Sequence, residues 1–339
     1  GGGIRGIIPA TILKKIEEIT KKPISKLFRL IGGTSTGGIL ALGLAKPKEE
    51  KSAEPHYSAE NLLDLYMKEH SSFFKENSLE NCKYETPEAF RSKFGEMTLD
   101  KALTDVLITT NSVEACSQKS VGVVLEAGSR LVSCISGALG YSPTPIYSHE
   151  IIPSTVHFFN RKGLSQMTYS LAALEEAQLP KIQKEENYCF PMKFVASATS
   201  AAPTYFPLIQ YKNTMLVDGG ILQNNPEIPC IFQAIEQGYA KEHLLMISLG
   251  TGEAGKNRGA FESIKDVLLP VWFKIVQPES RQELVIRKML KKGAYHRLQM
   301  KFSGKEPKLD DVSQVKFFVD SRKKSTNILS FHSKESIGN

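Results

Sequence analysis

The sequence is poor in tryptophan, in closely spaced cysteines and in long apolar runs. Its 339 residues include one tryptophan and five cysteines, and no two cysteines form a Cys-x-x-Cys pair. A small, odd number of scattered cysteines argues against a disulfide scaffold, and the lack of a Cys/His cluster argues against a zinc site. No apolar stretch approaches the length that spans a bilayer, so an integral membrane protein is not expected. Carboxylate-rich calcium loops are also lacking, and we expect neither a metal nor a cofactor.

Charge is distributed unevenly along the chain, whose net charge is +7. Hydrophobic residues make up 41% and charged residues 23% of the sequence, as in ordinary globular proteins. Between positions 287 and 308, eight basic residues are opposed by a single acidic one, Glu306. Such a stretch is either a surface for anionic lipid or nucleic acid, or a solvated helix face.

Residues 27–42 carry the clearest chemical pattern. They run from an apolar segment through Gly33-Thr34-Ser35-Thr36-Gly37 into a second apolar segment. Gly-x-Ser-x-Gly is the pattern of a nucleophile elbow, in which a strand turns sharply into a helix with the serine at the apex. The apex serine is strained, and side chains at Gly33 or Gly37 are expected to collide with the neighbouring strand and helix. The helix after Ser35 would direct its N–H groups at negative charge that develops there. Because the pattern also occurs by chance in loops, other segments have to support it.

The chain opens with a second glycine-rich segment, Gly1-Gly2-Gly3-Ile4-Arg5-Gly6. Apolar residues at three- and four-residue spacing from Ile8 to Ile19 predict a helix directly after it. The segment also fits the dinucleotide fingerprint G-x-G-x-x-G, but Lys21-Lys22-Pro23 stands where an acidic residue is required. We favour a nest of glycine N–H groups beside Ser35, which an acyl-transfer enzyme needs as an oxyanion hole. Because such a loop normally follows a strand, a strand upstream of Gly1 is expected.

Further segments downstream add to the pattern. Residues 194–202 are small and lead into Pro203-Thr204-Tyr205-Phe206-Pro207, which predicts a helix that packs closely against the elbow helix. Residues 215–217 predict a short strand, followed by Asp218-Gly219-Gly220 and Asn224-Asn225-Pro226. Asp-Gly-Gly is also a common turn, so Asp218 has a purely structural alternative. The apolar run at 244–249 is typical of a buried parallel strand.

The remaining elements are placed more coarsely. We predict helices at 57–74 and 170–179, a helix running into a strand at 99–110, a strand at 156–160 and a polar connector at 183–186. Between 111 and 154, glycine, serine and small apolar residues dominate, and Tyr141-Ser142-Pro143-Thr144-Pro145 interrupts regular structure. We interpret 111–154 as an insertion or a lid over the site.

These motifs follow one another in a specific order. They are the glycine loop, Gly-Thr-Ser-Thr-Gly-Gly, Ala-Ser-Ala-Thr-Ser-Ala-Ala-Pro, Asp-Gly-Gly with Asn-Asn-Pro, and Ser248-Leu249-Gly250-Thr251-Gly252. In this order, they resemble the patatin-like phospholipases, a family of lipid acyl hydrolases. The resemblance implies an α/β fold, a three-layer sandwich with a largely parallel central sheet flanked by helices. It implies a single catalytic domain at 1–330, with 253–339 as the more divergent, basic part of the chain.

The same resemblance implies a catalytic pair, with Ser35 as the nucleophile and Asp218 as the base, and no metal. Gly1, Gly2 and Gly3 with Arg5 would match the family's oxyanion hole, and Gly33 and Gly37 bracket the elbow. The implied reaction is hydrolysis of fatty-acyl esters of phospholipids through an acyl-enzyme on Ser35. The chain departs from the family in two respects: the strand and the aspartate that precede the glycine run are absent, and 111–154 has no counterpart in the pattern.

Two other interpretations stay open. An α/β-hydrolase with a Ser-Asp-His triad needs a late histidine, and His243, His296 and His332 follow Asp218, although none lies in a small-residue or glycine-rich loop. A lipid-binding protein without turnover would keep the fold, and an enzyme held inactive until an activating protein binds would carry the same residues. The expected partner is a phospholipid membrane surface rather than nucleic acid. The expected location is the cytoplasm or a membrane surface, and a secreted or translocated protein stays open.

Overall fold

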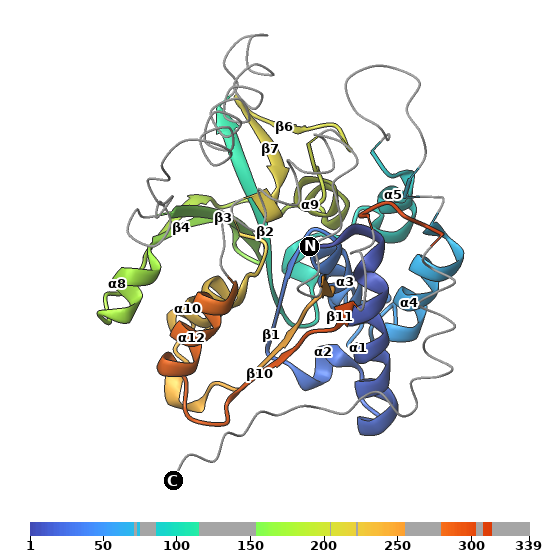
Figure 1. Cartoon of the computed structure of the whole chain (residues 1–339). Helices are drawn as coiled ribbons and strands as arrows, with labels where there is room; N and C mark the ends of the chain where they lie inside the picture. The colour runs from blue at the N-terminus through green and yellow to red at the C-terminus, as the bar shows by residue number, and fades with distance from the viewer. Residues whose placement is uncertain are drawn as a thin grey trace, which may run out of the picture.

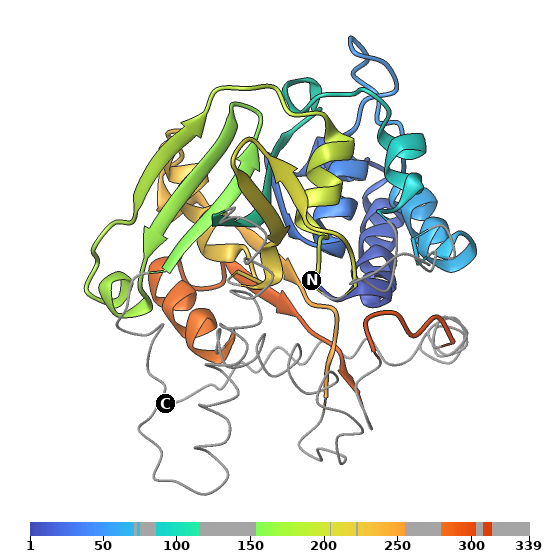
Figure 2. The same cartoon turned by 90° about the horizontal axis from the view of Figure 1, so that it is seen from above.

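The structure is a computed structural model, shown in Figure 1 and from above in Figure 2. It describes residues 1–70, 73–74, 86–114, 154–203, 205–221, 223–254, 279–302 and 308–313. Most of the proposed insertion, 115–153, lies outside the described residues, as does His332. The two ends of the predicted insertion are strand residues, because 111–114 continue one strand and Ser154 begins the next.

A mixed sheet of seven strands forms the centre of the described part of the chain. Its order is β5-β4-β3-β2-β7-β6, and β1 also pairs with β2. The strands are β1 (Leu30–Thr34), β2 (Asp105–Glu114), β3 (Ser154–Asn160), β4 (Gly163–Tyr169), β5 (Lys181–Glu186), β6 (Ile209–Tyr211) and β7 (Thr214–Asp218).

The expectation of a largely parallel sheet is wrong. Of the pairings in this sheet, β1 with β2 is parallel, and β2–β3, β3–β4, β4–β5, β2–β7 and β6–β7 are antiparallel. Two residues separate β3 from β4 and two separate β6 from β7, and so short a connection can join only antiparallel neighbours. A parallel pair needs a crossover of a dozen or more residues, such as the one that carries α3 between β1 and β2.

The long strand β2 carries two shorter strands on one of its edges. β1 pairs with residues 105–109 of β2, and β7 pairs with residues 110–114. Since β3 pairs with residues 108–110 and takes the other edge, β1 and β7 lie end to end along the same edge of β2. They run in opposite directions, so their carboxyl ends meet where Thr34 pairs with Thr109 and Asp218 pairs with Thr110. Figure 1 shows β1 and β7 at opposite ends of β2.

Helices cover both faces of the sheet, which gives three layers. Alternate residues of β2 point to opposite faces: Val106 and Ile108 join a core with α3 (Thr36–Ala45), α5 (Glu88–Phe94) and α9 (Met192–Thr199). Leu107 joins a second core on the other face, which includes residues of α8 (Leu171–Glu175), α10 (Glu227–Glu236) and α12 (Glu279–Met289). A third core joins α1 (Ile7–Thr20), α2 (Ile24–Leu27), α3 and α4 (Ala59–Lys68).

Several predicted elements are confirmed. The helix after the glycine loop is α1, the strand and helix around Ser35 are β1 and α3, and the small-residue helix is α9, which packs against α3. The helix predicted at 57–74 is shorter, since α4 ends at Lys68. The helix and strand predicted at 99–110 are a short 3₁₀ turn, Leu99–Lys101, followed by β2. The predicted strand at 156–160 is β3, and the predicted helix at 170–179 is the shorter α8.

Two predictions, for residues 183–186 and 244–249, differ from the structure. The polar connector at 183–186 is part of β5, an edge strand whose charged residues suit a solvent-facing edge. The run at 244–249 gives β8 (Met246–Leu249), which is parallel to β10 (Tyr295–Leu298) but lies in a separate two-stranded sheet. It is not buried, because Leu245 is 65% exposed and Ile247 is 36% exposed. β9 (Glu253–Ala254) pairs with β11 (Lys301–Phe302) in a further two-stranded sheet.

The helices give no sign of a membrane span. Across the ranges that the structure describes, none combines the length and the apolar character required to traverse a bilayer.

Candidate active site

Ser35 occupies the turn between β1 and α3 in a conformation that non-glycine residues rarely adopt. Its φ is 54° and its ψ is −122°. A serine held there stores backbone strain of about 1–3 kcal/mol, which persists only when surrounding contacts fix it. The side chain is partly exposed, and its hydroxyl hydrogen-bonds to Asp218. The predicted elbow and its partner carboxylate are therefore in direct contact.

The glycines around the elbow have unequal roles. A Cβ added at Gly33 would lie 2.2 Å from the Gly37 carbonyl oxygen, so this position requires glycine. A Cβ added at Gly37 would meet no described atom within 4 Å, and the collision expected there does not occur. The close contact lies one residue later, where a Cβ on Gly38 would come within 2.9 Å of the Thr199 side chain. The spacing in the sequence could not distinguish Gly37 from Gly38, because both lie in the first turn of α3.

Asp218 ends β7 and is 3% exposed. Its Oδ1 atom accepts the N–H of Gly220 at 2.7 Å, while its own backbone N–H donates to the Ala201 carbonyl at 3.0 Å. Burial raises the pKa of Asp218 to about 6, although the hydrogen bonds from Ser35 and Gly220 act in the opposite direction. A carboxylate with a pKa near neutrality is a better proton acceptor than an ordinary aspartate.

The glycine-rich segment lies against these two residues. A Cβ added at Gly1 would be 3.8 Å from Ser35 Oγ and 2.8 Å from Asn224 Oδ1. Gly3 has a φ of 54°, and a Cβ there would lie 2.1 Å from the Leu309 carbonyl oxygen. The loop thus approaches its neighbours too closely for side chains. Of the three glycines, Gly1 lies beside Ser35, whereas Gly2 lies against Thr251 and Gly3 against Leu309. Among the described residues, no acceptor is found for the N–H of Gly2 or Gly3, and their role in an oxyanion hole stays a prediction.

Arg5 lies in the same loop but directs its donors elsewhere. Its backbone N–H donates to the Gly2 carbonyl at 3.1 Å, and its Nε donates to the same oxygen at 3.3 Å. The N–H of the preceding residue, Ile4, donates to the Leu309 carbonyl at 2.7 Å. Arg5 therefore fixes the shape of the loop, and its N–H is not available to an oxyanion.

Four residues around the site were not singled out from the sequence. Thr199 and Asn111 hydrogen-bond to the backbone at Ser35 and at Asp218–Gly219, while Thr251 and Leu309 bind the backbone of the glycine loop. Thr199 and Thr251 belong to quoted motifs, and Leu309 belongs to Leu309-Asp310-Asp311, where the resemblance to the family is looser. Asn111 belongs to no motif. The roles of these residues depend on which strands and loops meet in space.

The sequence is also similar to a known protein family. The sequence profile described as Patatin-like phospholipase matches residues 1–231. The chain belongs to the patatin-like phospholipase family. A rice relative, "Patatin-like protein 2" of Oryza sativa subsp. indica, is 28% identical over 263 residues, which cover 69% of this chain and 51% of the relative. The chain thus spans about half the length of that curated relative.

Two other family members bear on function through their names. "Probable inactive patatin-3-Kuras 1" of Solanum tuberosum is 26% identical over 312 residues, covering 80% of this chain and 68% of that protein. "cGAMP-activated phospholipase" of Pseudomonas aeruginosa is 27% identical over 226 residues, covering 67% of this chain and 52% of that protein. Because one relative is named as inactive, membership of the family alone does not establish turnover.

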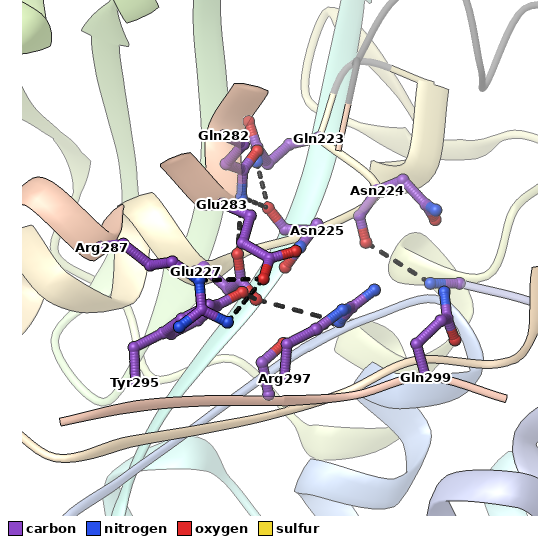
Figure 3. A network of polar contacts seen from close by, with 12 residues as sticks. Gln223, Asn224, Asn225, Glu227, Gln282, Glu283, Arg287, Tyr295, Arg297 and Gln299 are labelled. Carbon is purple, nitrogen blue, oxygen red and sulfur yellow. Dashed lines mark hydrogen bonds and ion pairs between the residues drawn. The ribbon is translucent and has the colours of Figure 1, made fainter. Parts of the chain in front are cut away.

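Behind the site, a buried polar network joins the family-matched part of the chain to α12 and β10 (Figure 3). The Glu227 carboxylate is 4% exposed and accepts hydrogen bonds from Tyr295 Oη at 2.7 Å and Gln282 Nε2 at 3.2 Å. Arg297 lies 3.9 Å from it and donates to Ser248 Oγ at 2.7 Å. Burial and the Glu227 carboxylate both raise the pKa of Tyr295, which keeps its hydroxyl a neutral donor.

We expect Glu227→Gln to destabilise the protein by about 3 kcal/mol, because it removes the buried charge beside the Arg297 guanidinium and replaces one of the two accepting oxygens by an amide nitrogen, which is a donor. The free energy of unfolding from urea titration measures the effect. Glu175→Gln is the matched control, since Glu175 forms a partly exposed ion pair with Arg281 at 3.2 Å. A loss in the control as large as that in Glu227→Gln would contradict the special role of the buried carboxylate.

The basic stretch at 287–308 is not a uniform surface. Arg297 is largely buried in the network just described, and Arg287 pairs with Glu283 at 2.6 Å on α12. Lys305 lies outside the described residues. No group of three or more His, Cys, Asp or Glu side chains in the described ranges could hold a metal ion.

Proposed function

We propose that this chain hydrolyses fatty-acyl esters of phospholipids at a membrane surface, through an acyl-enzyme on Ser35 with Asp218 as the general base. The observation that carries the proposal is the contact between the strained Ser35 and the buried Asp218 at the meeting point of β1 and β7. A nucleophile and base in hydrogen-bond contact, beside a loop of backbone donors, is the arrangement that acyl transfer requires.

In the proposed first step, Ser35 Oγ attacks the ester carbonyl and Asp218 takes its proton. The negative charge that develops on the carbonyl oxygen is stabilised by the N–H groups of Gly2 and Gly3, each worth on the order of 3 kcal/mol in such a role. Asp218 then gives the proton to the departing alcohol oxygen, which leaves an acyl group on Ser35. Water attacks this ester in the second step, with Asp218 again as the base. Asp218 then returns the proton to Ser35 Oγ as the fatty acid is released.

The test is reaction of the purified protein with a fluorophosphonate probe, followed by mapping of the modified peptide. We expect covalent labelling at Ser35, no labelling of Ser35→Ala, and release of fatty acid from phospholipid vesicles by the unmodified protein alone. Labelling at another residue, or phospholipid hydrolysis that persists in Ser35→Ala, would overturn the proposal.

A requirement for an activator is a second candidate, favoured by the name of the Pseudomonas relative. The same probe tests it. Labelling of Ser35 that is absent in buffer but appears on addition of membranes or cell extract would show that the site forms only with a partner.

We expect the rate of hydrolysis to rise with pH through a single ionisation near pH 6, because Asp218 accepts a proton only when it is ionised and its pKa is about 6. Above that pH the rate should reach a plateau. The measurement is kcat/KM for a soluble ester whose own ionisation lies outside the range studied. A rise of kcat/KM centred near pH 4 would instead indicate that the Asp218 carboxylate is in water-like surroundings.

A further inference from the structure

The last residue of α9 and the segment directly after it bind both members of the proposed catalytic pair. The backbone N–H of Ser35 donates to Thr199 Oγ1 at 2.9 Å, and the backbone N–H of Asp218 donates to the Ala201 carbonyl at 3.0 Å. One residue, Ser200, separates these acceptors along the chain. The same short segment therefore binds the main chain at the nucleophile and at the base, although Ser35 and Asp218 are 183 positions apart in sequence.

The Thr199 hydroxyl makes two hydrogen bonds. It accepts from Ser35 and donates to the Thr109 carbonyl at 2.7 Å, and the residue is 0% exposed. Thr109 lies on β2 at the position where the ends of β1 and β7 meet. Through one oxygen atom, Thr199 joins the elbow to the strand that positions Asp218.

This bond acts on a strained residue. Because Ser35 has a φ of 54°, its backbone relaxes unless neighbouring contacts hold it. The methyl group of Thr199 also lies against Gly38 in the first turn of α3, which sets how closely the elbow helix approaches α9. Loss of the hydroxyl would remove the side-chain acceptor of the partly buried Ser35 N–H and the side-chain donor to the buried Thr109 carbonyl, and the elbow would shift to compensate.

We propose that Thr199 is a positioning residue for the reaction: its hydroxyl holds the Ser35 main chain so that the serine hydroxyl stays in hydrogen-bond contact with Asp218. Thr199 does not touch the substrate and transfers no proton. The inference rests on the proposed function of Ser35 and Asp218 and assigns a new role within that site.

The test compares four proteins in the same phospholipid and soluble-ester assays: the unmodified chain, Thr199→Val, Thr199→Ser and Ser200→Ala. Valine keeps the shape of threonine but removes the hydroxyl, and serine keeps the hydroxyl. Ser200→Ala is the matched control, since the neighbouring Ser200 hydroxyl donates to the Ala196 carbonyl within its own helix at 2.7 Å.

For Thr199→Val we expect kcat to fall about 10- to 100-fold with KM nearly unchanged, because a displacement of the nucleophile affects the chemical step. The acid limb of the pH profile should also move upward, since the hydrogen bond from Ser35 that lowers the pKa of Asp218 is weakened. Thr199→Ser should retain the kcat and pH profile of the unmodified chain to within about threefold. Ser200→Ala should resemble the unmodified chain.

A purely structural role would lower the melting temperature of Thr199→Val while leaving its kcat and its pH profile unchanged, and that result would overturn the inference. Equal damage in Thr199→Ser would do the same. If Thr199→Val does not fold, Thr199→Ala removes the hydroxyl with less risk of overpacking and is read by the same criteria. Ser35→Ala distinguishes failure of the proposed function from failure of this inference. Full activity in Ser35→Ala would overturn both. An inactive Ser35→Ala together with a fully active Thr199→Val would overturn the inference alone.

Discussion

Replacing Asp218 by asparagine is expected to lower the rate of phospholipid hydrolysis by about a thousandfold or more, because an amide cannot accept the proton of Ser35. Fluorophosphonate labelling of Ser35 should fall in parallel. The asparagine oxygen can still accept the N–H of Gly220, and its amide can donate to Ser35 Oγ, so the fold has no reason to change. Steady-state kinetics on vesicles and circular dichroism measure the two effects.

The same substitution should make the protein more stable at neutral pH. The pKa of Asp218 is raised from 3.8 to about 6, so its contribution to the free energy of unfolding is present below about pH 4 and is lost as the pH rises through 6. Asparagine does not ionise and loses nothing in that range. Relative to the unmodified chain, Asp218→Asn should therefore gain about 3 kcal/mol between pH 4 and pH 7.

Two histidine variants complete this experiment. His243 and His296 are exposed, and we expect His243→Ala and His296→Ala to keep full activity. A severe loss of activity in either one, together with an active Asp218→Asn, would instead favour the α/β-hydrolase triad.

Gly33→Ala is expected to abolish activity and to lower the free energy of unfolding by about 3 kcal/mol or more. The added Cβ would lie 2.2 Å from the Gly37 carbonyl oxygen and 2.5 Å from the Gly38 nitrogen, and both are backbone atoms that cannot rotate away. Relief of the overlap would have to separate β1 from α3, and Ser35 lies between them. Urea unfolding and probe labelling of Ser35 measure the result.

Gly37→Ala is the matched control for this effect. The new Cβ meets no described atom within 4 Å, and alanine in a helix is favoured over glycine by roughly 0.5–1 kcal/mol. We expect this variant to be at least as stable as the unmodified chain and to retain labelling at Ser35. Equal damage at both positions would show that the two glycines serve the elbow in the same way, as the sequence pattern alone suggests.

Much of the local structure could be predicted from the sequence. The apolar periodicity after Gly6 predicted α1, and the Gly-x-Ser-x-Gly pattern predicted a strand, a sharp turn and a helix around Ser35. These features depend on contacts within a few residues, where side-chain spacing and the steric limits of the backbone decide the outcome. The order of the separated motifs also identified the family that the profile of residues 1–231 matches.

The direction of each strand and its neighbours in the sheet could not be predicted from the sequence. The alternation of side chains is the same in a parallel and an antiparallel strand, so the pattern of β7 does not reveal that it runs against β2. The length of β2, which accommodates β1 and β7 on one edge, brings the carboxyl ends of those two strands together. That placement decides whether Ser35 and Asp218 can meet at all.

The sequence by itself determined the residues that carry the proposed chemistry: a serine between glycines, a second glycine-rich loop and an aspartate after a short strand. Tertiary structure alone decided that Asp218 is buried, with a pKa near 6, that Gly33 rather than Gly37 is sterically required, and that Thr199 and Leu309 hold the elbow and the glycine loop. The physical reason is that burial, close approach and hydrogen bonding between distant segments depend on long-range packing, whereas a turn depends on the residues that form it.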